Sequence, residues 1–297
     1  MIDTKCNICP RRCNIYRDKT KGYCRESETV RVARAALHMW EEPCISGTNG
    51  SGTVFFSGCN LRCVYCQNKK ISDGSVGMEV SVERLAEIFC SLKEQNAHNI
   101  NMVTPTHFTL QIIRAIDMAR KRGMDLPVVW NTSGYESVDT VKMLDGYADI
   151  FLTDFKYMNP ETSKKYSSCP DYPIAAKAAL RQMVEQTGGN ELNQDGIMKK
   201  GVIVRHLLLP GFEKESESVL SYLHDEYKDR IKISIMSQFT PTDNLQNYPE
   251  INRKVTKYEY EKLVNYAQSI GIENAYIQEG GAAKESFIPD FDYTGLK

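Results

Sequence analysis

Three cysteines stand close together in the spacing Cys59-x3-Cys63-x2-Cys66. Clustered cysteines at short, regular spacing are typical of thiolate ligands to a metal. Three thiolates on a [4Fe–4S] cluster leave one iron without a protein ligand, and that iron can bind a substrate or cofactor directly. The alternative is a zinc site whose fourth ligand is Asn60 or His38. The spacing therefore predicts a metal centre with an open position.

A second group contains four cysteines, in the spacing Cys6-x2-Cys9-x3-Cys13-x10-Cys24. Four soft ligands within 19 residues suit either Zn²⁺ or an iron–sulfur cluster whose irons all have protein ligands. A metal-free knuckle or a disulfide pair is the alternative. Because a complete ligand set leaves no open position, we expect a structural or electron-relaying site here.

The sequence around the first group resembles a known superfamily, the radical S-adenosylmethionine (radical SAM) enzymes. The run Gly58-Cys59-Asn60-Leu61-Arg62-Cys63 is followed by Tyr65, directly before Cys66. Segments 41–47 and 50–58, with the upstream Cys-x2-Cys-Pro-Arg, resemble one branch of the pyruvate formate-lyase activating enzyme group. The resemblance implies a [4Fe–4S] cluster that receives an electron from a flavodoxin or ferredoxin-type donor. It also implies cleavage of S-adenosylmethionine to methionine and a 5′-deoxyadenosyl radical.

The resemblance further implies a substrate, a glycine in a partner glycyl-radical enzyme, from which the radical abstracts a hydrogen atom. Two other functions stay open. The radical chemistry can act on another peptide or on a small molecule, or the chain can be a non-catalytic iron–sulfur or zinc scaffold.

Beyond residue 50, short β-rich runs alternate with stretches of helical periodicity. We expect strands at 53–57, 99–103, 127–130, 150–153, 202–209, 232–236 and 275–278. We expect helices at 82–93, 110–120, 137–144, 173–186, 215–224 and 257–269. This alternation predicts an α/β fold of parallel strands with right-handed crossovers. The units are too few for a closed eight-fold barrel, so we expect a partial, open (β/α)6 barrel over 51–297, as the resemblance also implies. Residues 1–50 are expected to form a cysteine-rich N-terminal extension.

Polar side chains follow the predicted strands, where the active sites of parallel barrels are built. The residues that we expect to bind S-adenosylmethionine are Thr104, Asn131, Thr132, Asp154, Lys156, Arg205 and His206. Arg205 can form a charge-assisted hydrogen bond with the carboxylate of the cofactor. By contrast, Glu41 and Glu42 are expected in a solvated loop, and Cys44, Cys90 and Cys169 as small buried side chains.

The resemblance supports part of this set and differs in two places. Asp154-x-Lys156 matches an Asp-x-Lys of the activating enzymes, and Asn131-Thr132 stands where they carry Asp-Thr, beside the cofactor and a monovalent cation. Asn131 therefore removes one negative charge from any cation site. The Gly-Gly-Glu-Pro segment that usually binds the amino group of the cofactor is absent, and 103–107 reads Val-Thr-Pro-Thr-His.

Composition limits the remaining functions. The chain has 297 residues, 37 Lys+Arg against 38 Asp+Glu, and a formal net charge of −1. This balance offers no global field for nucleic acid or an anionic membrane, and the sequence contains no apolar run of membrane-spanning length. The first residues do not resemble a signal peptide, so we expect a cytoplasmic protein. Ten cysteines are then unusual, because disulfides are rare in a reducing compartment.

Overall fold

The computed structural model describes residues 5–273, 275–278 and 288–296. The strands are β1 (Arg31–His38), β2 (Ser51–Phe56), β3 (Met78–Glu79), β4 (Ile100–Val103), β5 (Val128–Thr132), β6 (Ile150–Asp154), β7 (Glu191–Leu192), β8 (Met198–Leu207), β9 (Lys232–Met236) and β10 (Ala275–Ile277). The α-helices are α1 (Pro43–Ser46), α2 (Lys69–Ser72), α3 (Val82–Glu94), α4 (Thr109–Lys121), α5 (Val138–Met143), α6 (Pro160–Ser167), α7 (Tyr172–Thr187), α8 (Glu213–Tyr227) and α9 (Lys257–Ser269).

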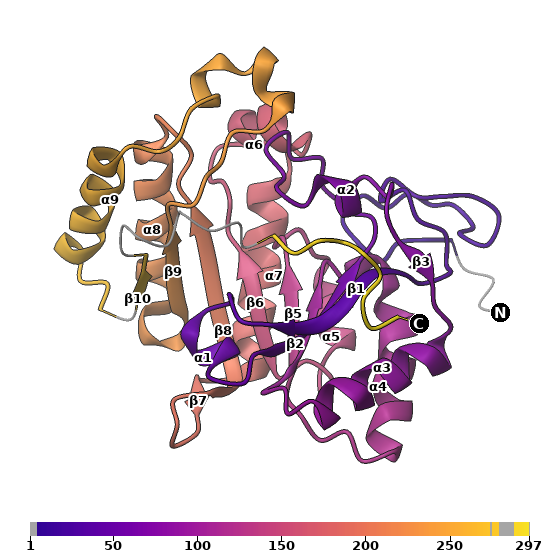
Figure 1. Ribbon diagram of the computed structural model, residues 1–297. Helices are drawn as coiled ribbons and strands as arrows, with labels where there is room; N and C mark the ends of the chain where they lie inside the picture. Colours follow the sequence, from indigo (N-terminus) through magenta and orange to yellow (C-terminus); the bar gives the residue numbers. More distant parts are fainter. Residues whose placement is uncertain (1–4, 274, 279–287, 297) are drawn as a thin grey trace.

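The main sheet has the strand order β10-β9-β8-β6-β5-β4-β2-β1-β3, and β7 pairs with β8 outside this path (Figure 1). Every neighbouring pair from β2 to β10 is parallel. Its two ends, β10 and β3, do not pair with each other, so the sheet stays open. The predicted α/β fold with a partial barrel is therefore confirmed.

Strand β1 was not expected from the sequence. It lies in the range predicted as an N-terminal extension, yet it pairs antiparallel with β2 through the register His38↔Ser51 to Val32↔Phe56. The C-terminal segment contacts the same strand, because the backbone N–H of Tyr293 donates to the carbonyl of Ala33 and the N–H of Ala35 donates to the carbonyl of Thr294. Residues 31–38 are thus an integral part of the sheet, whereas the cysteine-rich residues before them lie outside it.

The two faces of the sheet are covered differently. Figure 1 shows α7 and α8 behind the strands, and α1 with the C-terminal segment in front of them. The large apolar core lies between the outer face and the helices, and includes Trp130, Phe151 and Val204. The inner face carries a smaller apolar cluster in which Cys44 and Ile45 of α1 pack against residues of β5, β6 and β8. Helix α1 therefore fills one end of the barrel interior.

The parallel register places polar residues of neighbouring strands side by side. Asp154 of β6 is aligned with Arg205 of β8, and Arg205 with Ser234 of β9. Asn131 of β5 is aligned with Val103 of β4. Side chains of one strand alternate between the faces, so one residue of each pair of sequence neighbours points into the barrel. Among the described helices, none is long and apolar enough to cross a membrane.

Candidate active site

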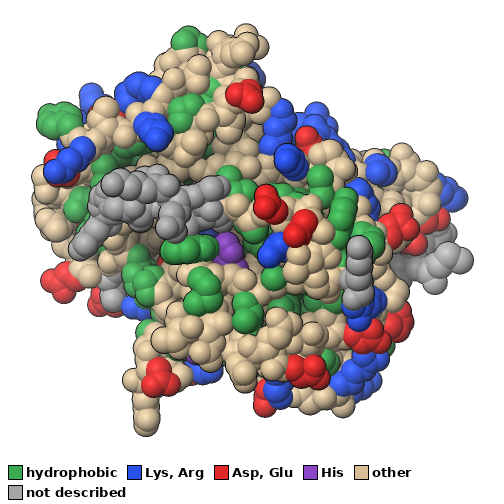
Figure 2. Space-filling view, in the orientation of Figure 1, with side chains coloured by type: hydrophobic (Ala, Val, Ile, Leu, Met, Phe, Trp, Pro, Cys, Tyr) green, Lys and Arg blue, Asp and Glu red, His purple; other side chains and the backbone are tan. Residues whose placement is uncertain are grey.

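A cavity of about 520 Å³ lies inside the partial barrel. This volume is in the range of cavities that bind small molecules and cofactors. Figure 2 views the open side of the sheet, where acidic and basic side chains stand among apolar ones around the central hollow. The predicted site residues that line the cavity are Cys59, Cys63, Cys66, Thr104, Asn131, Thr132, Asp154, Lys156 and Arg205. The structure thus brings together all but one of the residues predicted for the cluster and cofactor sites.

The three cysteines lie on the loop that follows β2, at the carboxyl end of the parallel strands. Burial raises the pKa of all three thiols, although Lys156 nearby partly opposes the effect. Buried thiols of this kind are stable as thiolates only beside a positive charge, which a metal cluster supplies. The three side chains line one wall of the cavity, so they fit a cluster whose remaining iron faces the interior.

A chain of hydroxyl groups ends at one of these sulfurs. The hydroxyl of Ser167 donates to Cys63 Sγ at 3.0 Å, and Ser167 in turn lies 2.8 Å from the hydroxyl of Tyr157. The hydroxyls of Tyr157 and Tyr65 are 2.5 Å apart, and both side chains are buried. Hydrogen bonds to cluster sulfurs tune reduction potentials, so this chain is a means to adjust the predicted centre. No sequence pattern pointed to Ser167 or Tyr157.

Three charged groups form the centre of the cavity. Lys156 Nζ lies 2.6 Å from one oxygen of Asp154, and Arg205 Nε lies 3.1 Å from the other. Burial alone raises the pKa of Asp154, but Lys156 and Arg205 hold it below its ordinary value. Burial lowers the pKa of Lys156, but the neighbouring Asp154 raises it by more, so the pKa of Lys156 lies above its ordinary value. All three groups are therefore charged at neutral pH.

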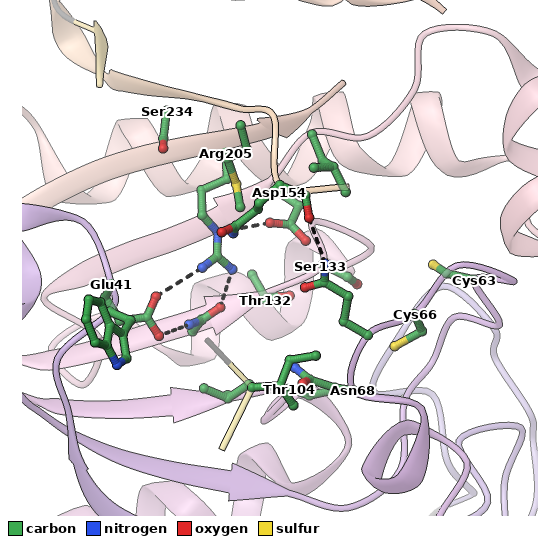
Figure 3. A pocket seen from close by; sticks show the side chains of 18 of the residues that line it. Glu41, Cys63, Cys66, Asn68, Thr104, Thr132, Ser133, Asp154, Arg205 and Ser234 are labelled. Atoms are coloured by element: carbon green, nitrogen blue, oxygen red, sulfur yellow. Dashed lines mark hydrogen bonds and ion pairs between the residues drawn. The ribbon is translucent and has the colours of Figure 1, made fainter. Parts of the chain in front are cut away.

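Arg205 is also held from its other side, as Figure 3 shows. Its Nη2 donates to Asn131 Oδ1 at 2.6 Å, and its Nη1 donates to Glu41 Oε2 at 3.2 Å. The guanidinium therefore lies between Asn131 and Asp154, and its positive charge occupies the space between these two side chains.

Glu41 and Glu42 were expected in a solvated loop, and this prediction is wrong. Glu41 Oε1 accepts hydrogen bonds from the side-chain amides of Asn101 at 3.0 Å and Asn131 at 3.2 Å. Glu42 has only 9% of its surface exposed, and both glutamates line the cavity. The reason is tertiary: β1 pairs with β2 and directs the chain before α1 into the barrel. Nothing in the local sequence distinguishes this segment from a polar turn.

Thr104, at the end of β4, has an unusual backbone conformation. Its φ of 58° lies in the left-handed region, which is strained for a β-branched residue. The conformation is held by a hydrogen bond of 2.9 Å from its N–H to the carbonyl of Asn131. Strained residues of this kind cluster at functional sites. Here the strain occurs at a wall of the cavity.

A buried carboxyl group, that of Glu136, links the ends of β4 and β5 by hydrogen bonds. Glu136 accepts hydrogen bonds from the hydroxyls of Thr106, at 2.5 Å, and Thr132. Its other oxygen is buried and has no partner among the described residues. Burial raises the pKa of Glu136 to about 7, although both threonines oppose the shift. Sequence reasoning missed Glu136, because a single glutamate after a strand carries no signal of burial.

His206 does not line the cavity, so the cofactor-binding role predicted for it does not hold. Its Nδ1 lies 2.8 Å from the carbonyl of Phe155, and its Nε2 lies 2.8 Å from Ser216 Oγ of α8. Burial lowers its pKa to about 4, so the ring is neutral at pH 7. The physical reason is strand alternation: Arg205 points into the barrel, and its neighbour therefore points to the helices.

The four N-terminal cysteines lie together in a compact knuckle, residues 5–30. Cys9 and Cys24 are buried, and burial raises the pKa of Cys9 to about 12. A Cβ atom added at Gly22 would lie 3.4 Å from Cys24 Sγ and 3.7 Å from Cys13 Sγ. Glycine thus leaves room between two of the sulfurs. All ten cysteines are free thiols, so the disulfide alternative finds no support. In the described part of the chain, no three His, Cys, Asp or Glu side chains are placed to hold one metal ion.

The knuckle packs directly against the loop of the other three cysteines. The N–H of Cys59 donates to the carbonyl of Cys24 at 3.3 Å, and Arg11 Nε donates to the carbonyl of Asn60 at 2.9 Å. At Gly58, whose φ is 84°, an added Cβ would lie 2.6 Å from the Cys24 carbonyl oxygen. Only glycine permits this approach, which makes the knuckle part of the wall behind the cysteine loop.

Comparison with known proteins gives a family match. The model of the Radical SAM superfamily matches residues 53–223. Uncharacterized protein MJ0674 of Methanocaldococcus jannaschii is 29% identical over 285 residues, which cover 93% of this chain and 78% of the relative. Uncharacterized protein MJ0808 of the same organism is 24% identical over 247 residues, 75% of this chain and 72% of that protein.

One solved structure shows the shared fold. It is the crystal structure of Streptococcus suis SuiB bound to S-adenosylmethionine, with a TM-score of 0.50 and 10% identity over 76% of this chain. The match covers 50% of SuiB, so this chain corresponds to about half of that protein. At this identity the likeness concerns the fold alone.

Proposed function

The chain belongs to the radical SAM superfamily, and from this premise we propose that it abstracts a hydrogen atom from a glycine of a glycyl-radical enzyme. The observation that carries the proposal is that Cys59, Cys63 and Cys66 line the same cavity as Asp154 and Lys156. Family membership supports radical SAM chemistry. The glycine substrate rests on the sequence resemblance to the activating enzymes.

Different residues of the cavity would bind the cluster and the cofactor. When bound, a [4Fe–4S] cluster and S-adenosylmethionine supply a 5′-deoxyadenosyl radical for hydrogen abstraction. Cys59, Cys63 and Cys66 would hold three irons. The ammonium of Lys156 offers a donor for the carboxylate of the cofactor, and the hydroxyls of Thr104 and Thr132 offer further polar contacts. These contacts follow from the fact that all of these side chains line one cavity.

Other side chains exclude water and fix charge. Phe55, Val103, Leu207 and Met236 form apolar parts of the wall. A dry wall of this kind protects a reactive intermediate from side reactions and strengthens the electrostatic interactions inside. Arg205 stays in place through Asp154, Asn131 and Glu41, and so gives the interior a fixed positive charge.

We propose that the knuckle binds a second metal through Cys6, Cys9, Cys13 and Cys24. The space beside Gly22 and the burial of two of the thiols support this proposal. The direct contact with the cysteine loop favours an iron–sulfur relay, and zinc remains the alternative. Metal analysis of anaerobically purified protein separates them: about eight irons are expected for two clusters, and about four irons with zinc for one.

We propose a flavodoxin or ferredoxin-type protein as the electron donor. Seven exposed basic residues lie within or beside the two cysteine groups in the sequence: Arg12, Lys19, Lys21, Arg25, Arg62, Lys69 and Lys70. Figure 2 shows lysine and arginine side chains over the region where Figure 1 places α2 and the N-terminal loops. A basic surface of this kind steers an acidic partner towards the site.

The test is anaerobic reconstitution with iron, sulfide, S-adenosylmethionine and dithionite. We expect 5′-deoxyadenosine from the wild type, none from Cys63→Ala, and a wild-type yield from Cys90→Ala as the matched control. With a candidate glycyl-radical enzyme added, we expect the doublet of a glycyl radical in electron paramagnetic resonance. Absence of 5′-deoxyadenosine would refute the enzymatic proposal and favour a scaffold. Product without the doublet, with any partner tried, would favour another peptide or a small molecule.

One observation favours this second substrate class. Helix α1, with Glu41 and Glu42, closes one end of the barrel interior. The closed end limits how much of a substrate can enter, so a small molecule or a single side chain fits there better than a long loop.

A further inference from the structure

The closed end of the cavity contains a carboxyl group without a sufficient partner. Glu42 has 9% of its surface exposed, and its Oε2 is buried without a hydrogen-bond partner among the described residues. The hydroxyl of Ser234, on β9, lies at hydrogen-bond distance from the Glu42 carboxyl group. Leaving a buried carboxylate oxygen without a donor is costly, so a group that completes it would be bound favourably.

The basic groups of the cavity are already engaged elsewhere. Lys156 is paired with Asp154, and Arg205 is held by Asp154, Glu41 and Asn131. Glu41 receives three hydrogen bonds, from Asn101, Asn131 and Arg205. Glu42 is therefore the carboxylate of the described lining that is left without a direct ion-pair partner.

A charge count gives the same result. The described lining contains three carboxylates, Glu41, Glu42 and Asp154, and two basic side chains, Lys156 and Arg205. His38 also lines the cavity, but burial and Arg34 lower its pKa, so it is neutral at pH 7. Glu42 is the carboxyl group left over from this count. Burial raises its pKa, although Arg205 and the hydroxyl of Ser234 oppose the shift, and a cation beside it would favour the charged form. Figure 3 shows Glu41, the neighbour of Glu42, at the opposite side of the view from Cys63 and Cys66.

We propose that Glu42 binds a cationic group of the substrate, an ammonium or a guanidinium. The lining of the same cavity includes the apolar or aromatic side chains of Trp40, Pro43, Tyr276 and Ile277, and Tyr276 lies near enough to Glu42 to interact with its charge. Apolar walls around one carboxylate fit an alkyl chain that ends in a positive charge, and aromatic faces favour the same charge. Such a group can belong to a lysine or arginine side chain next to a glycine, or to a small amine. This inference deepens the proposed function and rests on it for the identity of the bound molecule as a substrate.

Binding tests the proposal without any turnover. The probe is n-butylguanidinium, and N-butylurea is its neutral counterpart of nearly the same shape. Binding is followed by equilibrium dialysis in anaerobically reconstituted protein, with and without S-adenosylmethionine and with no reductant. We expect the guanidinium to bind at least about tenfold more tightly than the urea. Glu42→Gln keeps the shape of the side chain and should remove this preference, whereas Glu94→Gln, at an exposed site on α3, should retain it.

Two further probes distinguish the sources of the cation. N-acetyl-glycyl-arginine amide represents a peptide, and agmatine represents a small amine. Tighter binding of one of them, sensitive to Glu42→Gln, supports the proposal and identifies the source. Equal binding of n-butylguanidinium and N-butylurea to the wild type overturns the proposal. This comparison uses the wild-type protein alone, so it does not depend on whether a variant folds. If cation binding is found but 5′-deoxyadenosine never forms, the proposed function fails and the cation site stands. If 5′-deoxyadenosine forms but no preference for the cation is found, the cation site is refuted and the proposed function stands.

Discussion

The two cysteine groups touch each other but have opposite surroundings. The knuckle of Cys6, Cys9, Cys13 and Cys24 is held by its own turns, and it does not line the cavity. The loop of Cys59, Cys63 and Cys66 lies on a cavity wall beside polar strand ends. We therefore propose different roles for the same ligand type, because space for a reacting molecule lies next to the sulfurs in only one of these two groups.

Removing one thiol from each group tests this difference most strongly. We expect Cys63→Ala to lower the rate of 5′-deoxyadenosine formation by about a thousandfold or more, because two protein ligands do not hold the cluster. We expect Cys9→Ala to keep the rate within about tenfold but to lose the second metal and about 3 kcal/mol of stability. Product assay, metal content and urea unfolding measure these effects. Equal loss of activity in both variants would contradict the division of roles.

Glu136 lies between the two groups and gives a pH-dependent test. It bonds Thr106 and Thr132 on the cavity side, and its charge also raises the pKa of Cys9. Its pKa in the folded state, about 7, exceeds the unfolded value near 4.5, so the folded state binds the additional proton. Its contribution to stability is therefore present at low pH and lost as the pH rises from about 4.5 to about 7.

Glu136→Gln mimics the protonated side chain. We expect it to match the wild type at pH 5 and to exceed it by up to about 3 kcal/mol at pH 8, measured by urea unfolding of the two proteins at each pH. The exposed control Glu94→Gln should show no such pH-dependent difference. A constant difference between Glu136→Gln and wild type across this window would show that Glu136 does not titrate there.

Arg11 joins the two regions and tests their mechanical coupling. It donates to the carbonyls of Asn60 and Ser168, both at 2.9 Å, and lies over the rings of Tyr23 and Tyr135. We expect Arg11→Ala to cost about 2 kcal/mol, because it removes two charge-assisted hydrogen bonds and a packed side chain. Arg62→Ala is the matched control: it also removes an arginine over Tyr23, but from an exposed side chain. Equal urea midpoints for the two variants would show that Arg11 does not couple the regions.

Backbone strain provides the smallest expected effect. Left-handed residues occur in the knuckle at Asn14, with φ 54°, and at the cavity in Thr104, with φ 58°. Asparagine tolerates this conformation, whereas a β-branched threonine does not. We expect Thr104→Gly to gain about 1 kcal/mol and Asn14→Gly to change stability by less than about 0.5 kcal/mol, as judged by thermal unfolding. A loss of stability in Thr104→Gly would show that its side-chain contacts outweigh the strain.

Much of the fold could be predicted because its signals are local. Helix α9 and strand β9 have the bounds expected from the sequence, and the other predicted elements differ at most by a few residues. Strand β1 was missed, because its burial comes from pairing with β2 and the C-terminal segment, which lies more than 250 residues away. Helix α6 was also missed, since its eight residues are mostly polar.

The sequence indicated which residues lie together where they stand at the ends of neighbouring strands. It did not indicate positions that depend on the direction of a side chain or on contacts between remote segments. Asp154, Lys156 and Arg205 were expected together, because parallel strands bring their carboxyl ends to one edge. His206 was expected with them, although strand alternation turns it to the opposite face. Glu42 and Glu136 were missed, since burial of a carboxyl group depends on what packs around it rather than on its neighbours in sequence.

The sequence by itself determined the chemistry that the chain can support. Ligand type and spacing are covalent properties, so the three-thiolate centre predicted at Cys59, Cys63 and Cys66 follows from the sequence before the chain folds. The tertiary structure decided which groups that centre faces. It brought the segment before α1 into the barrel, fixed Arg205 between Asn131 and Asp154, and left Glu42 with an unpartnered oxygen. Charge balance inside a cavity depends on distances between remote segments, and those distances exist only in the folded chain.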